Sequence, residues 1–244
     1  MSDFKPNLPI ENAKLVVMST NNKELVKRVE ELGIKVLSSE NLSKLLIFEQ
    51  HHTDLQFLHY NNDTAFVLKE CSNLKEMLKN HFTNVIEISK SIEKDYPNNV
   101  MLNCVVLNDK LICNKKTIAN EILEMATNDN LKIINVNQGY TKCSTCIVNE
   151  NAIITPDKSI YKSCRNEMDV LLIKEGYIEL TGTDYGFIGG SSFKVNKNTL
   201  AFTGNIKLHP DYNSIKSFAK NHNVDLLSIT ENIMFDIGSI IPIE

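Results

Sequence analysis

The sequence predicts an α/β fold in which five repeated strand–strand–helix–strand units close into a ring. Three observations predict it. A polar, Asn-containing turn between two apolar runs recurs along the chain, a helical pattern follows each of these turns, and a final apolar strand has no helix after it. The anchors Asn103, Ser144 and Ser191 are 41 and 47 residues apart, a spacing typical of solenoids, propellers and other arrays.

Four hairpins begin the complete units. Residues 137–157 align without a gap with residues 184–204, so that Ser144 falls on Ser191. The same frame extends upstream to residues 96–116 and, with one extra residue, to 54–70. Each copy has an apolar run, a polar turn and a second apolar run, which predicts a hairpin, and Asn suits such turns because it tolerates positive φ.

A helical pattern follows each hairpin, and one more strand follows each helix. The helices are expected at residues 73–82, 117–128, 159–168 and 209–223, and the strands at 84–88, 131–136, 170–180 and 224–229. In the second helix Ile118 and Ile122 share one face, and Thr117 is placed to cap the N-terminus.

The first unit lacks its opening strand. It holds a strand at 14–19, a helix at 21–33 that ends at Gly33, and a strand at 34–39. The apolar C-terminal segment can supply the missing strand, so residues 233–241 are expected in the same sheet. Closure favours a ring over an open solenoid because it removes exposed end units; the alternative is an ordinary α/β or α+β domain with accidental similarity. We therefore expect a single domain, 1–244, with units at approximately 14–39 plus 233–244, 54–89, 98–136, 138–180 and 185–229.

Composition excludes several classes of function. The formal net charge is −4 and no basic block stands out, so neither nucleic acid nor a membrane surface is an expected partner. The sequence has no apolar run of membrane-spanning length and no signal-peptide pattern at its start, and we expect a cytoplasmic protein. The six cysteines are accordingly expected to be reduced.

This arrangement resembles the pentein fold, also called the α/β propeller. Arginine and agmatine deiminases, dimethylarginine dimethylaminohydrolases and amidinotransferases share it, and a non-enzymatic branch includes the ribosome anti-association factor. Residues 138–155 are similar to the dimethylarginine hydrolase blade that begins with His-x-Lys. Residues 185–200 are similar to the Gly-His-x-Asp blade of the agmatine deiminases. The resemblance covers essentially the whole chain as a repeat pattern.

The resemblance implies a C-terminal Cys nucleophile and a His acid/base, and this sequence has neither. Its last cysteine is Cys164, and no thiol occurs in the C-terminal stretch. Tyr140 and Phe187 stand at the two positions aligned with the family's His. We therefore expect a divergent pentein without thiol-based guanidino hydrolysis, and no catalytic residue can be named.

Two motifs invite a metal or redox interpretation. Cys143 and Cys146 form a C-x-x-C that the repeat frame places along a strand, where residues three apart point to opposite faces. Strand packing is the preferred interpretation; zinc binding with Cys104 or Cys113 and a redox role remain open. The sequence His51-His52-x-Asp54 is a possible metal or base cluster, but a solvated loop is preferred, so no metal and no cofactor is expected.

Polar residues on the first strands of the units should meet at the ring axis. They either form an internal hydrogen-bond network or bind a small polar ligand. Lys142 is expected to face this axial cleft with Asp54, Asp236 or Asp184 as its partner, since a buried ammonium needs one. The candidate ligand-binding residues are Asp54, Asn103, Tyr140, Lys142, Ser144, Asp184, Ser191 and Asp236.

Three functions are consistent with these observations. The first is a pentein that has lost the thiol machinery and binds a small polar or amino-acid-like ligand at the axial cleft. The second is an enzyme of altered chemistry, with Lys142, Tyr140 or an aspartate as proton carrier. The third is a protein–protein interaction module, like the anti-association branch.

Overall fold

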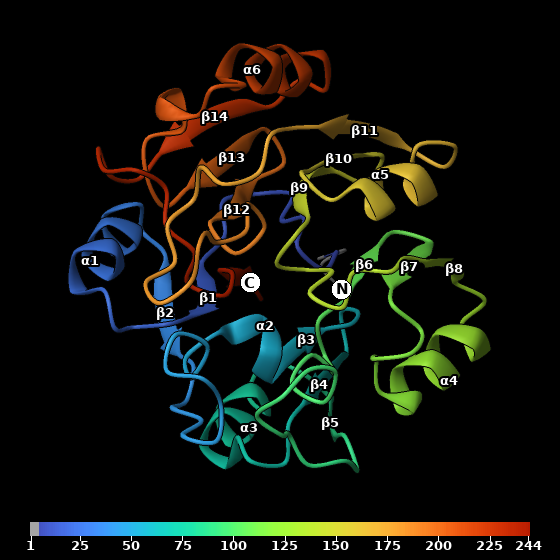
Figure 1. The fold of residues 1–244 in the computed structure, drawn as a ribbon. Coiled ribbons are helices and arrows are strands. Elements are labelled where there is room, and N and C mark those ends of the chain that lie inside the picture. The colour runs from blue at the N-terminus through green and yellow to red at the C-terminus, as the bar shows by residue number, and fades with distance from the viewer. Residues whose placement is uncertain (1–4) are drawn as a thin grey trace.

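The computed structural model describes residues 5–244 and confirms the ring of five units (Figure 1). Each unit has a three-stranded sheet whose inner strand is antiparallel to the middle one, while the outer strand is parallel to it. From the inner to the outer strand, the sheets are β15 (Ile241–Pro242), β1 (Leu15–Met18), β2 (Lys35–Ser38); β3 (Phe57–His59), β4 (Thr64–Val67), β5 (Asn84–Glu87); β6 (Val105–Leu107), β7 (Lys110–Cys113), β8 (Lys132–Asn135); β9 (Cys146–Asn149), β10 (Ala152–Thr155), β11 (Asp169–Leu172); and β12 (Ser192–Asn196), β13 (Thr199–Phe202), β14 (Asp225–Ser228).

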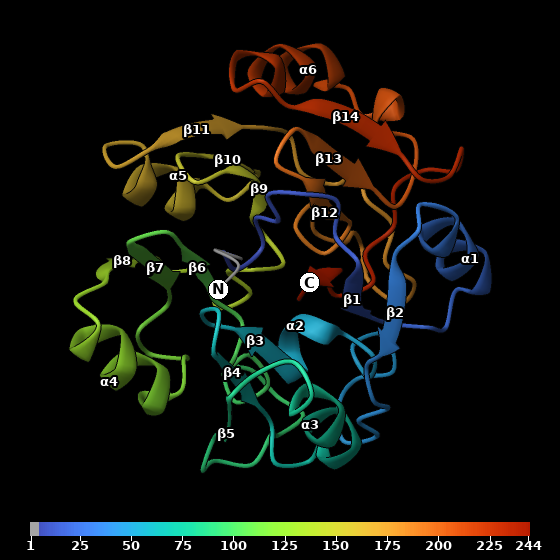
Figure 2. The same ribbon diagram turned by 180° about the vertical axis from the view of Figure 1, so that it is seen from behind.

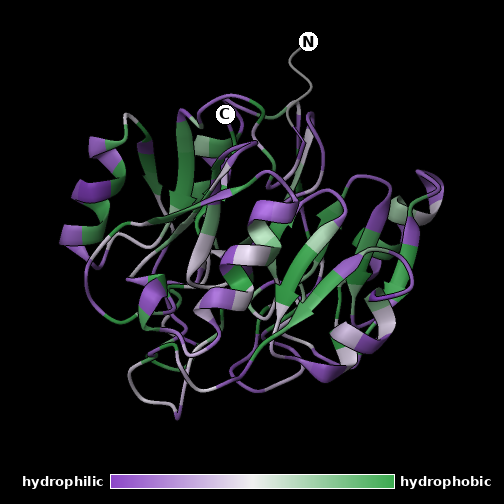
Figure 3. Ribbon diagram, turned by 90° about the horizontal axis from the view of Figure 1, so that it is seen from above, coloured by the Kyte–Doolittle hydropathy of each residue, from purple (hydrophilic) through white to green (hydrophobic). Residues whose placement is uncertain are grey.

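Most helices lie around the outside of the ring (Figures 1 and 2). They are α1 (Lys23–Glu31), α3 (Ser72–Leu78), α4 (Asn120–Asn128), α5 (Lys158–Cys164) and α6 (Tyr212–Asn221), with a short 3₁₀ helix η1 (Ile206–Leu208) before α6. Their polar sides face outward over largely apolar strands (Figure 3). Within residues 5–244, none of the helices combines the length and apolar character that crossing a membrane requires.

The recurring asparagines act mainly through their side chains. In three hairpins, the side-chain oxygens of Asn61, Asn149 and Asn196 accept hydrogen bonds from the backbone N–H two residues later, at 2.8–3.0 Å. This bond fixes the turn locally. Only the β6–β7 hairpin uses the expected positive φ, at Asn108. The repeated Asn is therefore explained by side-chain hydrogen bonding more than by backbone freedom.

The predicted helix ends need correction, since the helices expected at 73–82 and 159–168 end at Leu78 and Cys164. Helix α4 begins after Ala119 rather than after Thr117, whose hydroxyl donates instead to the Asn114 carbonyl at 3.3 Å. At the C-terminal ends, Gly33, Asn130 and Asn223 occupy equivalent positions after α1, α4 and α6 with φ of 82°, 57° and 57°. Such a residue turns the chain into the next strand.

The C-terminus closes the ring, as the missing strand of the first unit predicts. Val16 pairs with Pro242 and Val17 with Ile241 in an antiparallel arrangement. The expected bounds, 233–241, are wrong because only Ile241–Pro242 forms a strand. Gly238 and Ser239 have φ of 73° and 72°, and two successive residues in this region interrupt an extended chain. The two ends of the described chain lie on the same face (Figure 3).

Candidate functional site

Polar residues gather at the axis in tight turns, not on the inner strands where the sequence predicts them. Asn103 N–H bonds to the Val100 carbonyl and Ser144 N–H to the Tyr140 carbonyl, each just before an inner strand. Asp54 lies on α2 (Thr53–Gln56), a helical turn that the sequence did not predict. A turn satisfies its own backbone groups where no further strand is available to pair with. The turns thereby free side chains to point at one another.

Five of these residues, Asp54, Asn103, Lys142, Cys143 and Ser239, form a buried group that we call the axial cluster. Lys142 Nζ donates to Ser239 Oγ at 3.2 Å. The Ser239 hydroxyl lies 2.6 Å from Asp54 Oδ2 and 3.0 Å from the Gly189 carbonyl. A hydroxyl has one proton, so it donates to the nearer carboxylate. Lys142 therefore reaches Asp54 through Ser239.

This arrangement corrects the predicted partner of Lys142. The side chain is buried near the axis, but its direct partner is a hydroxyl, and no carboxylate of residues 5–244 bonds to it directly. Burial lowers the pKa of Lys142, although the Asp54 carboxylate opposes the shift. Lys142 and Lys194 also border a cavity of only about 10 Å³ beside the Asn7 segment, which holds at most one water molecule. Lys142 does not line the large cleft described below.

Asn103 holds the Cys143 turn in place. Its Oδ1 accepts from the backbone N–H of Lys142 at 2.7 Å and of Cys143 at 3.2 Å. Its Nδ2 donates to the Asp54 carbonyl at 3.3 Å and to Cys143 Sγ at 3.2 Å. The Cys143 thiol in turn donates to Asp54 Oδ2 at 3.0 Å. One amide side chain thus links its own unit to two others of the ring.

The two cysteines of the C-x-x-C lie in different structural surroundings. Cys143 lies in the turn at the axis, so the expectation that it packs along a strand is wrong. Cys146 opens β9 and is buried, in line with strand packing. Burial raises the pKa of both thiols. All six cysteines are free.

The glycine pair of residues 189 and 190 allows close contacts at the axis. A Cβ on Gly189 would collide with the backbone carbonyls of Lys142 and Cys143, and one on Gly190 would collide with the Asp236 carboxylate. Asp236 accepts backbone N–H bonds from Phe187 at 2.9 Å and Gly238 at 2.8 Å. Burial raises the pKa of Asp236.

Aromatic rings occupy the positions aligned with the family's His. Tyr140 stacks between Tyr96 and Phe187, with ring centroids 6.2 and 5.9 Å away. The Tyr140 hydroxyl donates to Glu49 Oε1 at 2.7 Å and accepts from Asn99. Burial and the Glu49 carboxylate raise the pKa of Tyr140 well above its usual range. Stacking and the bond to Glu49 therefore hold the Tyr140 ring in place.

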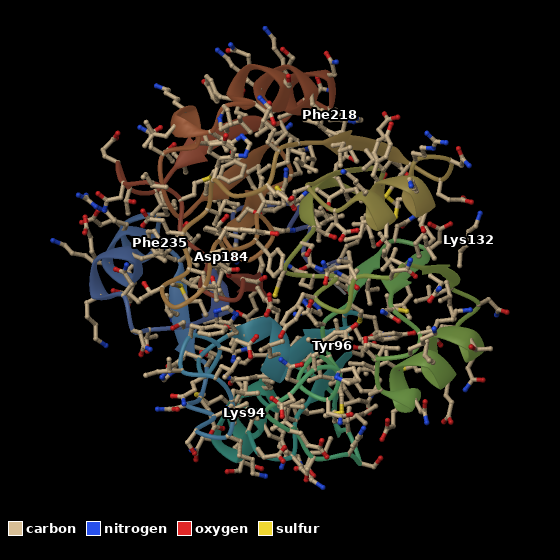
Figure 4. The ribbon with its side chains drawn as sticks, in the orientation of Figure 1. Lys94, Tyr96, Lys132, Asp184, Phe218 and Phe235 are labelled. Carbon is tan, nitrogen blue, oxygen red and sulfur yellow. The ribbon has the colours of Figure 1, made fainter. Side chains whose placement is uncertain are left out.

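A cleft of about 690 Å³ opens beside the axial cluster. It lies between the first unit, the loop before α2, the end of the fourth unit and the C-terminal segment, where Figure 4 labels Phe235. Its lining residues are Ser19, Asn21, Asn22, Ile47, Phe48, His51, His52, Glu179, Leu180, Thr181, Asn232, Ile233, Phe235, Asp236 and Ile237. His52 and Asp236, which are both buried, form its boundary with the axis. No Lys or Arg occurs among these lining residues.

The structure brings some predicted residues together and separates others. Asp54, Asn103 and Lys142 meet in the axial cluster, and Asp236 borders the cleft. Ser144 and Ser191 are buried, and the Ser191 hydroxyl donates to the Ile188 carbonyl at 3.0 Å. Asp184 is exposed on the loop at 181–186, so it is not the partner of Lys142. A ligand-binding role for these residues stays a prediction.

Sequence reasoning missed His52 and Cys143. The preferred interpretation of His51-His52-x-Asp54 as a solvated loop is wrong, because His52, the N-cap of α2, and Asp54, its second residue, are both buried. The sequence carried no helical signal here, because α2 spans only four residues. For Cys143, the signal was the glycine at the equivalent place of the next unit, which indicates close backbone contact.

Solved structures of amidinotransferases and of a dimethylarginine dimethylaminohydrolase share this fold. SxtG, an amidinotransferase from Microseira wollei, superposes with a TM-score of 0.58 at 10% identity over 98% of this chain and 97% of its own. The inosamine-phosphate amidinotransferase StrB1 from Streptomyces griseus gives 0.58 at 11% identity over 100% and 97%. The dimethylarginine dimethylaminohydrolase (DDAH) from Pseudomonas aeruginosa gives 0.57 at 7% identity over 90% and 92%. At these identities the likeness establishes the pentein fold alone.

Sequence comparison identifies the family. No curated protein matches the chain significantly. A family model described as "Family of unknown function (DUF6873)" matches residues 16–241, nearly the whole chain. This protein therefore belongs to the DUF6873 family, and its fold is that of the penteins.

Proposed function

We propose that this protein binds a small, polar, amino-acid-like ligand in the cleft beside the axis and does not hydrolyse guanidino groups. The cleft itself carries this proposal. At about 690 Å³ it has the size of a small-molecule site, and it combines apolar walls with polar groups from four segments of the chain. Those segments are distant in sequence and meet only because the ring closes.

The absence of the family's catalytic groups supports binding without hydrolysis. Displacement at a guanidinium carbon needs a nucleophilic thiolate and a proton donor for the leaving amine. Cys143, the thiol at the axis, is buried against the Asp54 carboxylate, and this raises its pKa. The stacked rings of Tyr140 and Phe187 fill the positions where the resemblance would place His. Neither chemical role therefore has an evident carrier.

The charges around the cleft favour a ligand with a cationic end. Asp236 and the exposed Glu179 are its carboxylates, and its walls have no Lys or Arg to neutralise a strongly anionic ligand. Asn22 caps α1, so the positive end of that helix dipole opens onto the same cleft. A zwitterion matches this charge distribution if its amino or guanidino group lies toward the protein carboxylates and its own carboxylate lies toward α1. Phosphorylated ligands, which carry more negative charge, do not match it.

A ligand panel with a cleft-blocking variant tests the proposal. Thermal shift and calorimetric titration would compare zwitterionic amino acids with their decarboxylated amines, and would detect any citrulline or urea released. Asn21→Trp places a large ring in the cleft mouth, while Lys27→Trp adds the same ring to the exposed surface of α1 away from it. We expect Asn21→Trp alone to abolish binding. Equal binding by both variants, or no binding by the wild type, would refute the proposal.

One observation favours a second candidate, an enzyme of altered chemistry. Ser239 stands near the C-terminus with a positive φ of 72°, and its hydroxyl lies between Lys142 and Asp54. Serine paired with lysine is a known nucleophile arrangement. Ser239 is fully buried and does not line the cleft, so we rank this function second. If a serine-directed acylating reagent labels the protein and Ser239→Ala abolishes the labelling, the enzyme of altered chemistry becomes the preferred function.

A further inference from the structure

Three metal-ligating side chains meet where the axial cluster borders the cleft. His52, Asp54 and Cys143 each offer one ligand atom, and these atoms all lie within 4.8 Å of one another. The three residues are 5%, 2% and 1% exposed. Ligand atoms around a tetrahedral zinc ion lie roughly 3.3–3.8 Å apart, given bonds of about 2.0–2.3 Å. Side-chain shifts on the order of 1 Å therefore convert the present spacing into a coordination shell.

Asp54 has one oxygen free for a further partner. Its Oδ2 accepts from Ser239 at 2.6 Å and from Cys143 at 3.0 Å. Its Oδ1 is buried and has no hydrogen-bond partner within residues 5–244. Leaving a buried carboxylate oxygen unpaired costs about 1–3 kcal/mol. A cation bound at Oδ1 would remove this cost without breaking the bond to Ser239.

The surroundings suit a bound thiolate. Asn103 Nδ2 already donates to Cys143 Sγ at 3.2 Å, and Asn103 Oδ1 fixes the backbone of the same turn. Outer hydrogen bonds of this kind orient metal ligands. One carboxylate, one thiolate and one divalent cation also form an electrically neutral group, which lowers the cost of burying the charges. Without the cation, the thiol proton removes one of the two negative charges, and the Lys142 ammonium, which reaches Asp54 through Ser239, faces the other.

From this geometry we propose that His52, Asp54 and Cys143 bind a divalent transition-metal ion of the zinc class. A mixed nitrogen, oxygen and sulfur set suits this borderline-soft cation, whereas calcium and magnesium require oxygen ligands. Three protein ligands leave a fourth coordination position. His52 is the ligand that borders the cleft, so an exogenous donor can reach the ion from that side. The site does not depend on the amino-acid-like ligand proposed above.

Cobalt substitution tests this site with two matched pairs of variants. Metal-free full-length protein would be titrated with Co²⁺ and with Zn²⁺, and the sulfur-to-cobalt charge-transfer absorption recorded. We expect one ion per chain and a thiolate band that Cys143→Ser removes. Cys146→Ser changes an equally buried thiol of the same motif outside the cluster and should keep the band.

The histidine pair keeps the proposal testable if Cys143→Ser does not fold. Loss of a hydrogen bond around a metal ligand weakens binding about 10–100-fold, so loss of a ligand itself should weaken it by at least about 100-fold. We expect this for His52→Gln, whereas His51→Gln, its neighbour outside the cluster, should bind as the wild type does. A wild type that binds no Co²⁺, a spectrum without a thiolate band, or equal affinities for His52→Gln and His51→Gln would overturn the proposal.

Discussion

Removing the Ile241 side chain tests how much the closing strand contributes to stability. Ile241 is 3% exposed and packs in the same apolar cluster as Leu15 and Val17 of β1, with which its strand pairs. Replacing such a residue by Ala costs about 2–5 kcal/mol, the lost transfer free energy plus the cavity left behind. In a chain of this size each 1 kcal/mol lowers Tm by about 2–4 °C. We therefore expect Ile241→Ala to lower Tm by roughly 4–20 °C.

Urea unfolding followed by circular dichroism measures the effect as a free energy. The matched control is Ile233→Ala in the same C-terminal segment, where the side chain is 46% exposed and the cost should stay within about 0.5 kcal/mol. Truncation after Ser239 removes three buried isoleucines, Ile240, Ile241 and Ile243, worth roughly 5–9 kcal/mol. That approaches the whole stability of a typical protein, about 5–15 kcal/mol. If Ile241→Ala costs no more than Ile233→Ala, the ring is not held closed by this strand.

Three further predictions concern charge, the aromatic stack and activity. Burial lowers the pKa of Lys194 to about 8, below its unfolded value of about 10.4, so the unfolded state binds more protons between these values and stability rises with pH there. Lys194→Met should therefore raise the free energy of unfolding by up to about 3 kcal/mol at pH 7, and this stabilisation should disappear near pH 10.4. A stabilisation that urea titrations find unchanged with pH would contradict this. Tyr140→Phe leaves buried Glu49 and Asn99 without their shared hydroxyl and should lower the unfolding free energy by about 1–3 kcal/mol. A change below about 0.5 kcal/mol, the range of an ordinary surface substitution, would show the network to be dispensable. Purified protein should release no citrulline from arginine or methylarginine and no carbamoylputrescine from agmatine, and activity that thiol alkylation removes would disprove the proposed loss of function.

The fold could be predicted from the sequence because the repeat carries its information locally. Each of the four complete units shows an Asn turn, a helical face and a following strand within one stretch, and the missing first strand of the remaining unit pointed to the C-terminus. The site could be predicted only in part, because it depends on contacts between units. Lys142 and Asp54 are 88 positions apart, and the Ser239 hydroxyl that joins them comes from a third segment. His52 became part of the site through a helical turn too short to leave a periodic pattern.

Methyl NMR of isoleucine-labelled protein tests most directly whether the cleft, and not the axis, is the ligand site. Ile47, Ile233 and Ile237 line the cleft, whereas Ile147 and Ile240 border the small cavity next to Lys142. Titration with the amino acids and amines of the ligand panel should shift the first three methyl signals, leave the other two in place and leave the ligand chemically unchanged. Shifts at Ile147 and Ile240 with none at Ile47, Ile233 and Ile237, or conversion of the ligand during the titration, would contradict the account.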